Sequence, residues 1–149
     1  MEELIGFLTE YAEMLEKMEQ KQVEKLGLLL TKELDKIEES IMMQQAMDKQ
    51  LQNMENKRQA LFAAGGLEGR TLKELAQMCT EVEEQQKLMD LYKRLDGTVG
   101  NICYYNEQAQ RIAKTELEKM GLDSRLVGNP TGIYGRSAAA KGQRFEKKV

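Results

Sequence analysis

The chain has 149 residues, of which 32% are charged and only 5% aromatic, and it contains no histidine. Because histidine is the commonest general base and metal ligand and completes the Ser-His and Cys-His nucleophile pairs, most catalytic and metal sites are excluded. The net charge of −3 is divided unevenly, since the last 29 residues hold six Lys and Arg against two acids and the first 120 hold 16 against 23. We therefore expect a binding protein with an acidic body and a basic tail, no enzymatic activity, no metal and no cofactor.

Helix-forming residues dominate the composition, and no run of four β-branched or aromatic residues occurs that would form a strand. The sequence predicts an all-α fold, namely an elongated antiparallel three-helix bundle or coiled coil. We expect a short helix between the second and third long helices and a flexible C-terminal tail. The helical bundle should cover residues 1–120 and the flexible basic tail residues 121–149.

The first predicted helix covers residues 2–30. Its apolar residues recur at alternating steps of four and three, which is typical of the buried seam of a bundle helix. This seam comprises Leu4, Leu8, Tyr11, Leu15 and Met18 and continues, after the polar Gln22, to Val23, Leu26 and Leu29.

A second helix is expected over residues 32–63, because the apolar stripe changes phase around Leu29 and Thr31 can cap a new helix there. The glycines that follow, Gly65, Gly66 and Gly69, should end it. They do not have the spacing of a phosphate-binding loop and do not follow a strand, so no nucleotide site is expected.

Two capping boxes predict the remaining helices, one from Thr71 to Glu74 and one from Thr80 to Glu83. They indicate a short helix over 72–78 and a long third helix over 81–120. In the long helix, Gly97 and Gly100 favour a local kink, and Gly121 is a suitable stop.

The third helix should be longer than its neighbours, at about 60 Å against about 45 Å. Its last turns carry Ile112, Leu117 and Met120, which we expect to form an apolar stripe that the partner helices do not reach. Such a stripe would bind a helix from another protein.

The tail is rich in glycine and too poor in bulky apolar residues to form a core of its own. Its isolated apolar residues are suited to docking on another surface, and the sequence leaves open whether residues 122–149 lie against the chain's own stripe. These residues are Leu122, Leu126, Val127, Ile133, Tyr134 and Phe145.

Other classes are disfavoured by what the sequence lacks. In the basic tail only Tyr134 and Phe145 could stack on bases, and the acidic body repels phosphates, so no nucleic-acid binding is expected. The longest apolar runs have four or five residues, against about 20 for a membrane span, and no secretory signal precedes Cys79 and Cys103. We expect a cytoplasmic protein with reduced cysteines and no membrane insertion.

Taken together, these features resemble the FlgN family of flagellar export chaperones, and the resemblance spans nearly the whole chain. It depends on the seam from Leu4, on the phase break, on the apolar end of the second helix, on the stretch around Asn106, and on a tail motif with a basic terminus. The break reads Leu29-Leu30-Thr31-Lys32-Glu33-Leu34, the helix end Arg58-Gln59-Ala60-Leu61-Phe62 and the tail motif Tyr134-Gly135-Arg136-Ser137. The tail departs from the family's usual pattern at Ala138, where a second glycine often follows.

The resemblance implies a chaperone that binds the helical terminal region of hook-associated proteins, prevents their premature assembly and delivers them to the export gate. It implies that Tyr134 docks on the cytoplasmic domain of the export gate. It also implies a client-binding surface formed by Ile112, Leu117, Met120, Leu122, Leu126 and Val127. The alternative is a structural coiled-coil protein that associates with itself, and whether the protein is a monomer or a homodimer stays open, as does the identity of the client.

Overall fold

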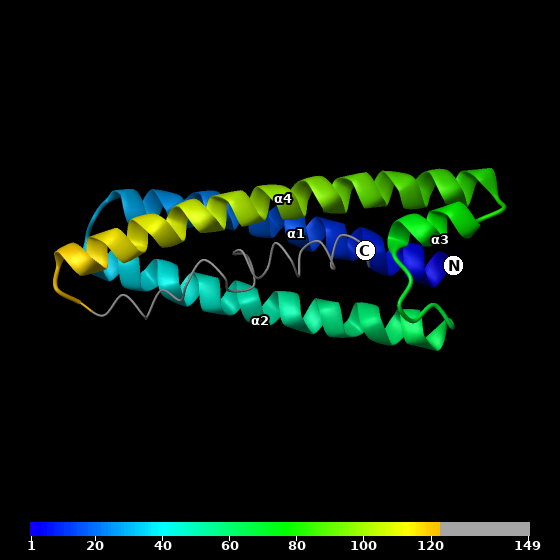
Figure 1. Cartoon of the computed structure of the whole chain (residues 1–149), viewed down its shortest axis with the longest axis horizontal. Helices are drawn as coiled ribbons and strands as arrows, with labels where there is room; N and C mark the ends of the chain where they lie inside the picture. The colour runs from blue at the N-terminus through cyan, green and yellow to red at the C-terminus, as the bar shows by residue number, and fades with distance from the viewer. Residues whose placement is uncertain (123–149) are drawn as a thin grey trace.

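The computed structural model describes residues 1–122, and these contain four helices and no strand (Figure 1). They are α1 (Glu2–Leu30), α2 (Leu34–Ala64), the short α3 (Leu72–Met78) and α4 (Val82–Lys119). The all-α class is confirmed, including a short helix before the last long one. The division at residue 120 into a bundle and a flexible tail stays a prediction, because residues 123–149 lie outside the described part of the chain.

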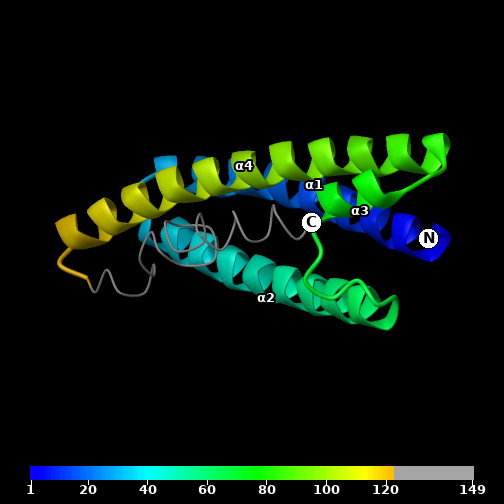
Figure 2. The same cartoon turned by 45° about the vertical axis from the view of Figure 1, so that its right-hand side comes forward.

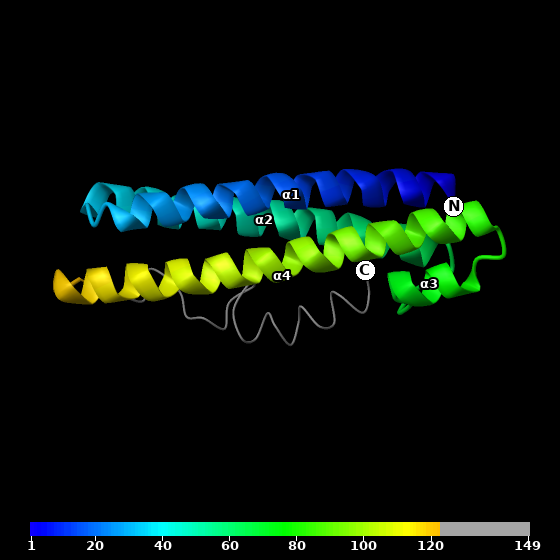
Figure 3. The same cartoon turned by 90° about the horizontal axis from the view of Figure 1, so that it is seen from above.

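The three long helices give the molecule an elongated shape (Figures 1 and 3). α2 runs antiparallel to α1, and α4 runs parallel to α1. The short α3 packs against the first part of α4. α1 is the central helix because it packs against both α2 and α4, whereas α2 and α4 approach each other closely at very few points. Figure 2 shows these two helices lying apart on one side of α1.

The first of the two predicted capping boxes is present and the second is not. The Thr71 hydroxyl accepts a hydrogen bond from the Glu74 amide at 3.0 Å, and the Thr71 amide donates to the Glu74 carboxylate at 3.2 Å. The prediction for Thr80 is wrong, because α4 begins at Val82 and its N-cap is Glu81, which makes no side-chain capping bond. Thr80 therefore lies one residue before the N-cap. A hydroxyl would reach the amides of the first turn only from the N-cap itself.

The break after α1 lies where the phase change predicts it, but Thr31 ends α1 and does not begin α2. Its hydroxyl donates to the Leu28 carbonyl at 2.7 Å, while Lys32 turns the chain with a φ of 60°. The N-cap of α2 is Glu33, so the helix begins two residues later than the expected residue 32. The kink that Gly97 and Gly100 favour does not interrupt the helix, since α4 continues through both.

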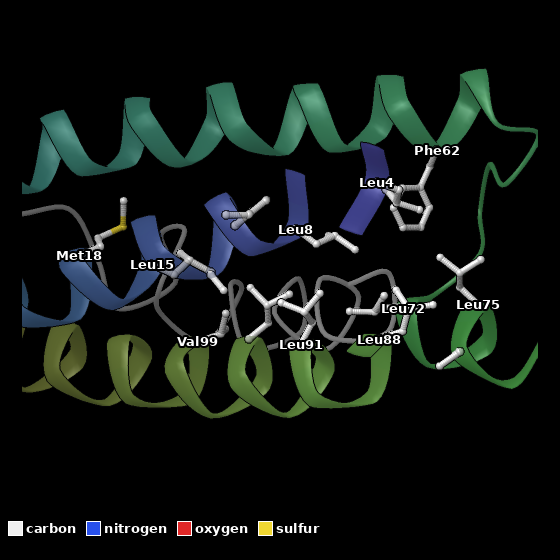
Figure 4. Close-up of a cluster of buried hydrophobic side chains, with 14 of the residues drawn as sticks. Leu4, Leu8, Leu15, Met18, Phe62, Leu72, Leu75, Leu88, Leu91 and Val99 are labelled. Atoms are coloured by element: carbon white, nitrogen blue, oxygen red, sulfur yellow. The ribbon is translucent and has the colours of Figure 1, made fainter. Parts of the chain in front are cut away.

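The buried residues form two clusters along the molecule. The larger one fills the part where α1, α3 and α4 meet, with Met47 and Phe62 added from α2. Figure 4 shows Leu8 and Leu15 of α1 in this cluster, opposite Leu91 and Val99 of α4. The smaller cluster joins the end of α1, the start of α2 and the end of α4 through Leu29, Ile37, Ala109, Ala113 and Leu117.

Between the two clusters the seam of α1 is polar. Gln22 is fully buried and Lys25 is 3% exposed, whereas Val23 is 50% exposed. The prediction that the seam passes through Val23 is wrong. The strict alternation of four and three residues runs from Met18 to Gln22, Lys25 and Leu29. The position of a residue on the helix, and not the polarity of its side chain, therefore determines which residues are buried here.

Candidate functional site

The end of α4 is covered by the other long helices as far as Leu117. This side chain is 1% exposed because it shares a cluster with Leu29 of α1 and Ile37 of α2. Ile112 is half-buried and packs against the same cluster. The expectation that Leu117 lies on an uncovered stripe is therefore wrong, since the turn between α1 and α2 lies at the same end of the molecule as the end of α4 (Figure 1). We call this the distal end.

The residues after Leu117 do extend beyond this cover. Met120 is 39% exposed and Leu122 is 41% exposed. Two hydrogen bonds hold this end of α4, from the Leu122 amide to the Leu117 carbonyl at 2.9 Å and from the Gly121 amide to the Glu118 carbonyl at 3.0 Å. Together with the φ of 72° at Gly121 they form a Schellman motif, which fixes the direction in which the chain leaves the helix.

Two further apolar residues are exposed at the distal end, and the sequence reading did not single them out. Leu30 is 62% exposed and Leu34 is 40% exposed, on either side of the turn between α1 and α2. In the run Leu28-Leu29-Leu30, only Leu29 fits the spacing of the α1 seam and is buried. This spacing is the feature of the sequence that could have indicated the exposure of Leu30. Leu30, Leu34, Met120 and Leu122, here called the distal apolar residues, thus belong to elements that meet at one end of the molecule.

A network of polar side chains lies behind the distal end and joins the three long helices. The Lys25 ammonium of α1 donates to the Gln44 amide oxygen of α2 at 2.5 Å and to the Asn106 amide oxygen of α4 at 2.7 Å. Gln22 donates to the same oxygen of Gln44 at 3.0 Å. Because burial disfavours the charged form, the pKa of Lys25 is lowered to about 7, although the nearby carboxylate of Asp48 opposes the shift.

A second polar group lies on α2 towards the other end. The Arg58 guanidinium is 2% exposed, pairs with the Glu55 carboxylate at 2.5 Å and lies over the Phe62 ring at 5.1 Å. The Tyr11 hydroxyl of α1 donates to the same carboxylate at 3.2 Å. These bonds hold Glu55 against α1 and compensate for the burial of the arginine charge.

Leu126, Val127 and Tyr134 lie outside the described residues. Within residues 1–122, the two cysteines form no disulfide with each other, and burial raises the pKa of Cys79. None of the four helices there is long and apolar enough to cross a membrane.

Comparison with known proteins gives one match. The family described as FlgN protein matches residues 1–140. A search of curated proteins and a search of solved structures each found no match.

Proposed function

The chain belongs to the FlgN family of flagellar export chaperones, and we propose that its clients are hook-associated proteins of the hook-filament junction. In this proposal the chaperone binds the helical terminal region of the client, prevents its premature assembly and delivers it to the export gate. All three steps take place in the cytoplasm. In this proposal the chaperone carries out no covalent chemistry, which agrees with the family being one of chaperones.

The observation that carries the client-binding proposal is the exposure of Met120 and Leu122 beyond a well-packed helix end. A chaperone for a helical segment needs apolar side chains that are accessible but held in fixed positions. The Schellman bonds from Gly121 and Leu122 hold these two side chains, and Leu30 and Leu34 add apolar surface at the same end. Burying one such side chain in a complex contributes roughly 1.5 to 3 kcal/mol.

The remaining residues of the proposed surface have different parts in it. Ile112 and Leu117 form the packed base that holds the end of α4 in place. Leu126 and Val127 follow Leu122 in the sequence after three further residues, and in this proposal they also contact the client. Tyr134, further along the chain, docks the loaded chaperone on the cytoplasmic domain of the export gate.

The test is calorimetry between the full chain and a purified hook-associated protein, using the double variant Met120→Asp with Leu122→Asp. Because two apolar contacts are replaced by charges, we expect affinity to fall by more than about tenfold, which corresponds to about 1.4 kcal/mol. Leu117→Asp is unsuitable, since a carboxylate at a position that is 1% exposed would unfold the end of α4.

The matched control replaces two exposed apolar residues away from the distal end, Met78 at 52% and Val82 at 78% exposure. The Met78→Asp, Val82→Asp variant should bind as the unmodified chain does. Equal affinity for both double variants, with circular dichroism still helical, would remove the distal end from the client-binding surface.

Self-association is tested separately by analytical ultracentrifugation over a range of concentrations. A chaperone should remain a monomer or reach a homodimer as its limiting assembly. A structural coiled coil that associates through the same residues would keep growing as concentration rises.

A further inference from the structure

The side of α1 that lies between α2 and α4 is not closed by contacts between those two helices. α1 packs against each of them, but α2 and α4 approach each other closely at very few points (Figure 2). We call this the α2–α4 side. A bundle of three helices that closed completely would pack all three pairs of helices, so this side is available to a fourth element.

The positions of two contacts on α1 determine which residues of α4 face this side. Tyr11 donates to Glu55 of α2, and Glu16, five residues later, pairs with Arg94 of α4. At 3.6 residues per turn, five residues rotate by about 140°, so Glu16 lies on the flank of α1 that is turned away from α2. Arg94 thus marks the flank of α4 that is remote from α2.

The same argument applies within α4. Cys103 follows Arg94 by nine residues, a rotation of about 180°, and therefore lies on the flank of α4 that is turned toward α2. Asp96 and Glu107 lie on this flank with it, and all three side chains are half-buried. Asn101 lies two residues before Cys103, points to a different face and is exposed.

The facing stripe of α2 is acidic as well. Lys25 bonds at once to Gln44 and to Asn106 of α4, so Gln44 faces the line where the three helices meet. Asp48 follows Gln44 on the same stripe, accepts a hydrogen bond from the Gln44 amide at 2.8 Å and is half-buried. The pKa of Asp48 is raised by its burial. One carboxyl group of α2 and two of α4 therefore border the α2–α4 side.

The chain that follows Leu122 has the complementary charge. Residues 123–149 hold six Lys and Arg against Asp123 and Glu146, whereas residues 1–122 hold 16 basic and 23 acidic residues. The segment starts at the distal end, and 27 residues can span up to about 90 Å, more than the length of α4 at about 57 Å. Its apolar residues are spaced along it rather than gathered at one place.

We propose that residues 123–149 dock on the α2–α4 side of their own chain. Their basic residues pair with Asp48, Asp96 and Glu107, and their isolated apolar residues cover the half-buried side chains between these acids. Docking within one chain is favoured over docking of a separate partner because the tether supplies a high effective concentration.

Disulfide trapping in the full-length chain tests the docking without any client. Ser137→Cys places a thiol in the segment, Cys79→Ser removes the unrelated cysteine, and Cys103 is the partner on the α2–α4 side. The control moves the partner to the other face by Asn101→Cys with Cys103→Ser. We expect the disulfide to Cys103 to form about tenfold faster than the disulfide to the control cysteine. At about 1 M salt, where charges are screened beyond about 3 Å, the difference should shrink.

A second pair of variants tests the charges. Asp96→Lys with Glu107→Lys should abolish the preference for Cys103, whereas Glu83→Lys with Asp90→Lys, an equal change of charge at two exposed positions on a different face, should preserve it. Equal trapping rates at the two faces in helical, folded protein would overturn the proposal. Disulfides that form between molecules and increase with concentration would overturn it in favour of a second copy.

Discussion

Lys25 is the residue whose environment departs most from what its side chain favours. An ammonium group at 3% exposure loses its hydration and retains two amide oxygens as acceptors. A polar residue in an otherwise apolar seam commonly fixes the register of neighbouring helices, because any sliding leaves it without partners. We propose this role for Lys25, since its partners lie on α2 and on α4.

The lowered pKa of Lys25 predicts a specific dependence of stability on pH. The pKa is about 7 in the folded chain and 10.5 in the unfolded chain, so above pH 7 the unfolded state binds the additional proton. Stability should therefore rise as the pH increases from about 7 to 8.5, because the cost of burying the charge is relieved. Thermal unfolding at several pH values in this range measures it.

Lys25→Met should remove this rise, and Lys21→Met, which changes an exposed lysine four residues earlier, should keep it. The range ends at pH 8.5 because Cys79, whose pKa is raised from 9.0, affects stability at higher pH. A flat profile for the unmodified chain would contradict the lowered pKa.

At the scale of helices, the sequence predicts existence and order well because helix-forming residues and 3.6-residue periodicity are local properties. The seam of α1 up to Met18 and the capping box at Thr71 follow directly from spacing. The burial of Leu117 could not be predicted, because it depends on where the end of α1 and the start of α2 lie relative to α4 in space. Strict spacing alone predicts that Gln22 and Lys25 lie in the buried seam. Their polarity argues against burial unless their hydrogen-bond partners Gln44 and Asn106 are known.

The two predicted capping boxes allow a matched test. Thr71→Ala removes a capping hydroxyl from a helix of seven residues and should destabilise α3 by about 1 kcal/mol. Thr80→Ala should change stability by less than about 0.5 kcal/mol, because no capping bond involves that side chain in α4.

Amide exchange across residues 72–78 is the appropriate readout, since a short helix can open without global unfolding. Faster exchange in Thr71→Ala than in Thr80→Ala agrees with the observed caps. The reverse order would show that the second box, and not the first, holds the chain.

For the whole molecule, the polar network of Lys25, Gln44 and Asn106 separates a large core from a small one at the distal end. The small core holds the end of α4 in place while Met120 and Leu122 remain exposed beside it. This arrangement links fold and proposed function, because a rigid helix end presents the exposed apolar side chains that we propose the client contacts.

Amide exchange of the full chain, with and without a purified hook-associated protein, tests the central claim most directly. We expect new protection in the last turn of α4 and in residues 120–127, with the turn between α1 and α2 also protected and the start of α1 unchanged. Protection centred on the opposite end, around α3 and the start of α4, with none at residues 120–127, would contradict the account.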